Sequence, residues 1–210
     1  MKALDAIQVI NDLAASQQGL FTAAQVQAFG VDRVSLARLA ERGQIERVEH
    51  GVYRAGGAPS TRVEDVLAAW MGLEPAVPSY LRDKSPRGFT ASLNTAAWLH
   101  GLGELNPAPI TFSHPTRRQT RRKDLAFIKR ILNETDITAV SGIPVTTAAC
   151  TIVDLVDYGE DLSLVANVLN DAIGAGLIED EAAVAREIDR RARARGFDPG
   201  FPLYEYLRRQ

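Results

Sequence analysis

The chain has 210 residues and a mass of 22.9 kDa, which suits one large domain or two small ones. Its 46% hydrophobic and 24% charged residues exclude intrinsic disorder and collagen-like repeats. No segment approaches the ~18 consecutive apolar residues of a membrane-spanning helix. The first residues lack the apolar stretch of a signal peptide, so we expect a cytoplasmic protein without a membrane partner. One cysteine, Cys150, and three histidines predict no disulfide, no metal site and no cofactor.

The net charge of −2 hides an uneven distribution along the chain. Residues 1–60 carry six basic and six acidic side chains, residues 61–130 carry eleven and six, and residues 131–210 carry seven and fourteen. The middle of the chain is therefore basic and its last part acidic. Such segregation indicates an anion-binding surface in the middle.

Two helices are predicted near the N-terminus. Apolar residues recur every three positions in residues 4–13 and give the first helix one apolar stripe. Thr22 and Gln25 fit a capping box, in which the threonine hydroxyl accepts from the Gln25 backbone NH and the Gln25 side chain reaches back. This second helix is short and ends at Gly30, a residue suited to the left-handed conformation after a helix.

A third helix and a hairpin complete this pattern. Asp32 caps the third helix and Gly43 closes it. Residues 45–48 and 52–54 then flank a glycine-containing turn and predict a β-hairpin. Three helices and a hairpin, with a short turn between the second and third helices, predict a winged helix-turn-helix domain over residues 1–58.

In such a domain the third helix enters the major groove of DNA, and the hairpin, or wing, meets the backbone or the minor groove. The residues expected in the major groove are Arg33, Val34, Ser35 and Arg38. Phosphate contacts are expected from Thr22, Gln25 and Arg42, and wing contacts from Arg47, His50 and Arg54. Winged helices also serve as protein-interaction modules, and the balanced charge of this segment gives little attraction to DNA. Docking of a protein partner therefore stays open as the alternative.

Residues 59–210 predict a second, mixed α+β domain. The boundary is placed at Pro59, after two glycines and before a possible capping box at residues 61–64. A helix follows through residues 66–71. The further expected helices are 91–100, 148–156, 162–175 and 181–194, and the expected strands are 110–114, 125–129, 137–140 and 143–145. Strands between helices, without a βαβ rhythm or a glycine-rich phosphate loop, indicate the α+β class.

A basic run lies between two of these strands. It consists of Arg117, Arg118, Arg121, Arg122 and Lys123. Five positive charges within seven residues, with no acid among them, repel one another unless an anion is near. The run is either a nucleic-acid contact, with each neutralised phosphate adding about 0.9 to the salt slope of binding, or a solvated loop.

Several stretches resemble the AbiEi-type antitoxins of type IV toxin-antitoxin systems. In the first domain these are residues 19–22, 30–31 and 39–54. In the second domain they are Ala91–Leu102, Gly142–Thr147 and Thr151–Leu155. The resemblance covers the chain from about Gly19 to Tyr158. Each motif is weak alone, and their order and spacing together carry the resemblance.

The resemblance implies an autorepressor that binds operator DNA upstream of its own operon. It also implies antitoxin action of the second domain against a nucleotidyltransferase-like toxin, without a stable complex. We expect a monomer in solution and two copies on an inverted-repeat operator. The alternative then becomes a winged helix that docks the toxin, or another protein, directly. The basic run would serve either repression or antitoxicity.

The sequence contains few features that would support an enzymatic function. His100 and His114 have no serine or cysteine motif beside them, and the Gly-Ser and Asp-x-Asp pattern of a nucleotidyltransferase is absent. Asp154 and Asp157, three residues apart on a predicted helix, could ligate a metal ion and form a nuclease site. A solvated acidic face explains the same spacing. We therefore expect no catalytic residues.

Overall fold

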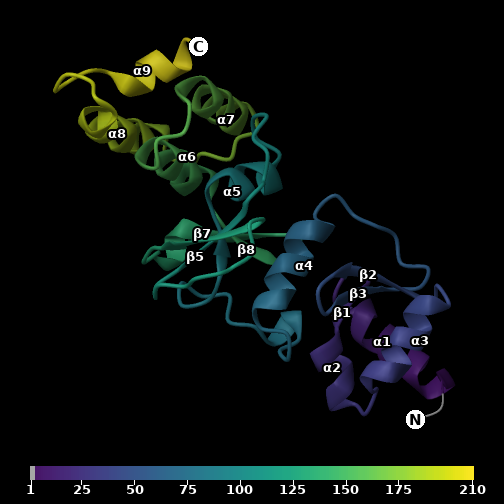
Figure 1. Ribbon diagram of the computed structural model, residues 1–210. Coiled ribbons are helices and arrows are strands. Elements are labelled where there is room, and N and C mark those ends of the chain that lie inside the picture. The colour runs from purple at the N-terminus through teal and green to yellow at the C-terminus, as the bar shows by residue number, and fades with distance from the viewer. Residues whose placement is uncertain (1–2) are drawn as a thin grey trace. The chain divides into compact units, whose positions relative to one another are not determined.

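The computed structural model describes residues 3–210 and divides into two compact units (Figure 1). The first unit ends at Asp83 and the second spans Lys84–Gln210. Helices and sheets occur in both units, so the predicted α+β class is confirmed. The first unit continues past residue 58, the boundary expected from the sequence. None of the helices in the described part of the chain has the length and apolar character needed to cross a membrane.

The first unit begins with the element order of a winged helix-turn-helix domain. Its elements are α1 (Ala3–Ala15), β1 (Leu20–Thr22), α2 (Ala23–Ala28), α3 (Arg33–Glu41), β2 (Ile45–Glu49), β3 (Val52–Ala55), α4 (Glu64–Leu73) and the 3-10 helix η1 (Ser79–Leu81). The predicted helices and hairpin are present. Strand β1 was not predicted; it pairs antiparallel with β3 and completes a sheet of order β1-β3-β2.

Local capping signals set the helix-turn-helix geometry. The Thr22 hydroxyl accepts from the Gln25 backbone NH at 3.1 Å, and the Gln25 side chain accepts from the Thr22 NH at 3.0 Å. Asp32 accepts from the Ser35 NH at 2.7 Å and starts α3. Each such cap stabilises its helix by about 1 kcal/mol. Gly30, in the turn between α2 and α3, has a φ of +86°, which glycine adopts without strain.

Helix α4 belongs to the first unit because it packs against β1, β2 and β3. It begins at Glu64, so the capping box expected at residues 61–64 does not form. The Glu64 carboxylate instead accepts from the Ser60 hydroxyl at 2.6 Å and from Arg54. Residues 74–82, which we call the strap, follow α4 and also belong to this unit.

The second unit contains a mixed sheet and a helical layer. Its elements are β4 (Thr90–Ala91), α5 (Leu93–His100), β5 (Ile110–His114), β6 (Leu125–Lys129), η2 (Glu134–Asp136), β7 (Ile137–Val140), β8 (Ile143–Thr146), α6 (Ala148–Asp157), α7 (Leu162–Gly174), α8 (Glu181–Arg191), η3 (Ala192–Arg195) and α9 (Leu203–Arg208). The strand order is β6-β5-β4-β8-β7. The β4–β8 and β5–β6 pairs are parallel, and the other pairs are antiparallel.

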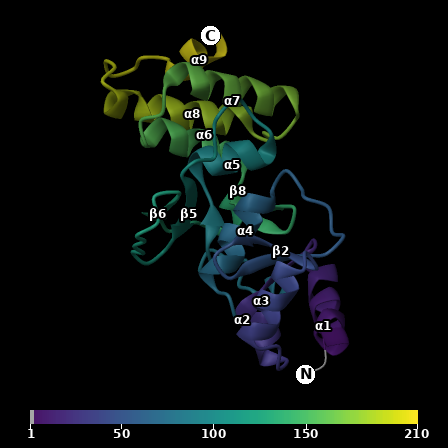
Figure 2. The same cartoon turned by 45° about the vertical axis from the view of Figure 1, so that its right-hand side comes forward.

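Within this unit, α5 and α6 lie between the sheet and helices α7–α9 (Figure 2). The core between the helices is apolar and includes Ile152, Val165, Leu169 and Ile188, all fully buried. The predicted strands and the helices up to α8 are present. Two elements were not predicted from the sequence. They are β4, which is only two residues long and precedes α5, and α9 near the C-terminus.

Candidate nucleic-acid interface

Helix α3 presents a basic face and buries an apolar one. Leu36 and Leu39 are 2% and 3% exposed and pack into the core with α1 and α2. Arg33, Val34 and Arg38 are exposed. This is the division that the 3.6-residue period predicts for an amphipathic helix. The side chains expected to read the major groove are therefore on the surface.

Two other predicted residues of α3 differ in their surroundings. Ser35 is only half-exposed, and its hydroxyl donates to the Asp32 carboxylate at 3.2 Å. Backbone and side-chain bonds from Ser35 also hold the pKa of Asp32 below its usual value. Arg42, at the C-cap of α3, is exposed. Arg42 is thus free to meet a phosphate, whereas Ser35 takes part in the cap of its own helix.

The turn of the wing carries an arginine–histidine pair. Arg47 Nη2 lies 3.0 Å from His50 Nδ1, and both side chains are exposed. Arginine can only donate hydrogen bonds, so Nδ1 of His50 must be the acceptor and the proton of the neutral ring is on Nε2. Arg47 also donates from Nε to the carbonyl of Glu49 at 3.3 Å, so neither of these two bonds is made to a carboxylate.

Arg54, expected to contact the DNA backbone, instead forms ion pairs inside the first unit. It pairs with Glu46 across the hairpin and with Glu64 of α4, whose Oε2 lies 2.6 Å from Arg54 Nη1. Bonds from these two carboxylates raise the pKa of Arg54. Its side chain is 15% exposed. Two carboxylates neutralise its charge, so Arg54 lacks the free cation that a phosphate contact requires.

Thr22 and Gln25, expected to contact phosphates, are also internal. They are 0% and 2% exposed. The Thr22 hydroxyl donates to the carbonyl of Pro75, and Gln25 Nε2 donates to the carbonyl of Val77 at 3.2 Å. Gln25 further exchanges hydrogen bonds with Gln17. Their polar groups hold the strap against α2, which excludes the phosphate role expected from the sequence.

The basic run lies in the connection between β5 and β6, and its members differ. Arg118 stacks over the Phe89 ring at 5.5 Å and lies 3.4 Å from Nε2 of His114. Arg122 forms an ion pair with Asp124 at 2.6 Å, which holds the pKa of Asp124 below its usual value. Arg117, Arg118, Arg121 and Lys123 are exposed, whereas Arg122 is half-buried. The uncompensated charge of the run is therefore smaller than its sequence indicates.

The two carboxylates considered for a metal-dependent nuclease bind different arginines. Asp154 is fully buried and pairs with Arg130, and burial raises the pKa of Asp154 to about 7. Asp157 lies 2.8 Å from Nε of Arg191. Residues 3–210 contain no group of three or more potential metal ligands among His, Cys, Asp and Glu. These carboxylates are explained by ion pairing.

The structure is that of a winged-helix protein with an appended α+β domain. A family model described as "Transcriptional regulator, AbiEi antitoxin" matches residues 8–56, and one described as "AbiEi antitoxin C-terminal domain" matches residues 89–196. The second match alone spans more than half of the chain. The chain therefore belongs to the AbiEi antitoxin family, which confirms the resemblance seen in its sequence. The family is one of regulatory antitoxins.

A solved structure has the same fold. The crystal structure of the RV2827C protein from Mycobacterium tuberculosis matches with a TM-score of 0.56 and 16% sequence identity, over 96% of this chain and 75% of that chain. At this identity the match concerns the fold alone. A comparison with curated proteins finds no match.

Proposed function

We propose that the protein represses its own operon by binding operator DNA through α3. The observation that carries this proposal is the outer face of α3, where Arg33, Arg38 and Arg42 are exposed and, among the described residues, pair with no carboxylate. Arg38 suits bidentate recognition of guanine, and Val34, 58% exposed, suits contact with a thymine methyl group. Two copies of a monomer would occupy an inverted-repeat operator.

The second part of the proposal is antitoxin action in a type IV system. The second unit would counteract a nucleotidyltransferase-type toxin without forming a stable complex with it. The exposed Arg117, Arg121 and Lys123 of the basic run would contact nucleic acid in either repression or antitoxicity. A triple alanine variant of these residues, assayed for operator binding and for rescue of cells that express the toxin, separates the two roles.

Fluorescence anisotropy tests the DNA-binding function. The full-length protein is titrated into a labelled duplex from upstream of its own gene and into a scrambled duplex, over a series of KCl concentrations. Arg38→Ala should weaken binding to the native duplex by about 1–3 kcal/mol and change binding to the scrambled duplex much less. Arg186→Ala, which removes an exposed charge from α8, is the matched control. Unchanged native-duplex affinity in Arg38→Ala would refute this assignment.

The second candidate is direct docking of a protein on the winged helix. It is favoured by Phe29, which is 60% exposed in the turn between α2 and α3, close in sequence to the exposed Val34. The salt dependence separates the two candidates, because phosphate contacts weaken steeply with salt and an apolar protein interface does not.

A further inference from the structure

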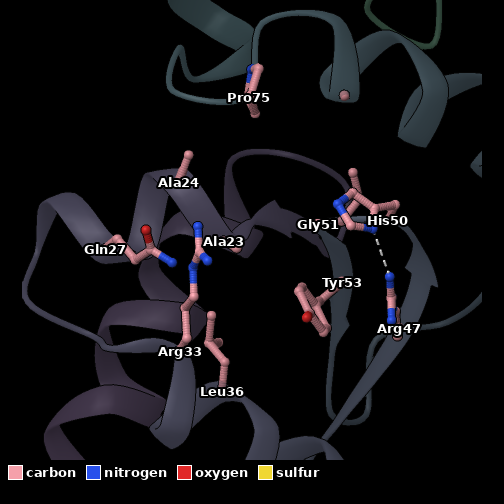
Figure 3. A pocket seen from close by; sticks show the side chains of 12 residues that line it. Ala23, Ala24, Gln27, Arg33, Leu36, Arg47, His50, Gly51, Tyr53 and Pro75 are labelled. Atoms are coloured by element: carbon pink, nitrogen blue, oxygen red, sulfur yellow. Dashed lines mark hydrogen bonds between the residues drawn. The ribbon is translucent and has the colours of Figure 1, made fainter.

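A cleft of about 470 Å³ lies between α3, the wing and the end of α4 (Figure 3). The residues that matter for its chemistry are Arg33, Arg47, His50, Tyr53, Gly72 and Pro75. Arg33 extends from α3 on one side, and Arg47 with His50 stands on the other, beyond the ring of Tyr53 (Figure 3). Three predicted DNA contacts from two elements, α3 and the wing, thus line one cleft.

The polar side chains of this cleft favour an anion. Arg33, Arg47 and His50 are among its lining residues, and that lining includes no carboxylate. The Glu49 carboxylate lies beside Gly72, with Oε1 3.4 Å from where a Cβ at that position would be, and it is not part of the lining. Because His50 accepts from Arg47 through Nδ1, its Nε2–H remains as a further donor. A group with several acceptor oxygens and a negative charge matches this set.

Part of the remaining lining is small and apolar. Ala23 and Ala24 of α2 contribute methyl groups, and Pro75 of the strap faces them (Figure 3). Pro75 is held in place because its carbonyl accepts from the buried hydroxyl of Thr22. Gln27 of α2 also lines the cleft, beside Arg33 (Figure 3), and its amide can donate to an anion as well as accept from an arginine.

We propose that the cleft binds a phosphate of the DNA backbone through Arg33, Arg47 and His50. The proposal rests on the proposed DNA-binding function and deepens it. A strand alongside α3 in the major groove passes between that helix and the wing, where these donors line the two sides of the cleft. Arg33 then fixes the register of the protein on the duplex and Arg38 reads a base, so that two arginines five positions apart have different roles.

Salt-dependent anisotropy with the full-length protein tests this assignment. Arg33→Ala and Arg47→Ala should each weaken binding to the native and the scrambled duplex by the same factor, about tenfold for a lost charged hydrogen bond. Each should lower the slope of log affinity against log salt, by at most the ~0.9 that one neutralised phosphate contributes. Arg186→Ala, with the same change in net charge, should alter neither quantity. Melting temperatures equal to that of the wild type establish that the variants are folded.

Replacing one charged phosphate of the DNA by an uncharged linkage locates the phosphate that the cleft binds. Duplexes carrying one methylphosphonate at successive positions should include one that weakens the wild type about tenfold. That same duplex should weaken Arg33→Ala by a smaller factor than it weakens the wild type, because Arg33 supplies part of the interaction with that phosphate. Full additivity of the two changes would overturn the proposal.

The remaining outcomes separate the cleft from the general function. A loss confined to the native duplex would make Arg33 a base-reading residue and overturn the phosphate assignment. Inorganic phosphate could instead raise the melting temperature of the wild type but not of Arg33→Ala, while the two proteins have equal salt slopes on DNA. That result would show a site for a free phosphate compound and would also overturn the phosphate-backbone assignment. Equal affinity of the wild type for both duplexes would count against the repressor function, while the salt slopes would still test the cleft.

Discussion

Replacing Arg82 by methionine should strongly destabilise the first unit. Arg82 is only 5% exposed and stacks 4.7 Å from the ring centroid of Trp70. Its guanidinium donates to the carbonyls of Trp70, Met71, Glu74 and Val77. It therefore caps the C-terminal end of α4 and fixes the strap at the same time. Burial lowers the pKa of Arg82 to about 10, so the side chain keeps its charge at neutral pH.

The magnitude follows from the partners that are lost. A hydrogen bond to a charged group contributes about 1.5–3 kcal/mol, and such bonds within one network are not additive. Methionine restores most of the buried volume but leaves the four carbonyls without their donor. The desolvation cost of the buried arginine offsets part of the loss. We expect a net destabilisation of about 3 kcal/mol, which lowers the melting temperature of a unit of this size by about 12–24 °C.

Tryptophan fluorescence measures this change in the first unit alone. The chain has two tryptophans, so a Trp98→Phe background leaves Trp70 as the reporter. Arg42→Met replaces an exposed arginine of the same unit and serves as the control, with an expected change within about 0.5 kcal/mol. A melting temperature of Arg82→Met no lower than that of Arg42→Met would refute the capping role.

Two further predictions concern the extent of the first unit and the buried carboxylate of the second. A fragment of residues 1–83 should fold cooperatively, whereas a fragment of residues 1–58 should not. In the shorter fragment Thr22 lacks its partner Pro75 and the sheet lacks α4. Equal thermal transitions of the two fragments, measured by circular dichroism, would contradict this prediction. Burial raises the pKa of Asp154 to about 7, above its unfolded value of about 3.9, so the folded unit retains a proton that the unfolded chain releases between these values. The stability of the second unit should therefore fall as pH rises through this window. Asp154→Asn should flatten the fall, and a wild-type melting temperature that rises from about pH 5 to about pH 7 would disprove it.

Local signals were sufficient for most of the backbone. The capping box of Thr22 and Gln25 and the cap at Asp32 involve atoms three residues apart, so the sequence alone predicts them. The strands of the second unit follow from short apolar runs between turn residues. The two-residue strand β4 has no such signal, because it exists only through its pairing with β5 and β8. The expected cap at residues 61–64 failed because Glu64 is bound by Arg54.

The roles of side chains were predictable only where they depend on helical period alone. Arg33 and Arg38 are exposed because they lie away from the face of α3 that carries the buried leucines. Thr22 and Arg54 have the residue types of DNA contacts, but each has a partner that the helix-turn-helix pattern does not contain, Pro75 or Glu64. An arginine beside a wing is available to a phosphate only when no carboxylate of its own fold reaches it first. In this protein Glu64 of α4 binds Arg54 and the strap binds Thr22, so the composition of the proposed DNA-binding surface depends on residues beyond the winged-helix pattern.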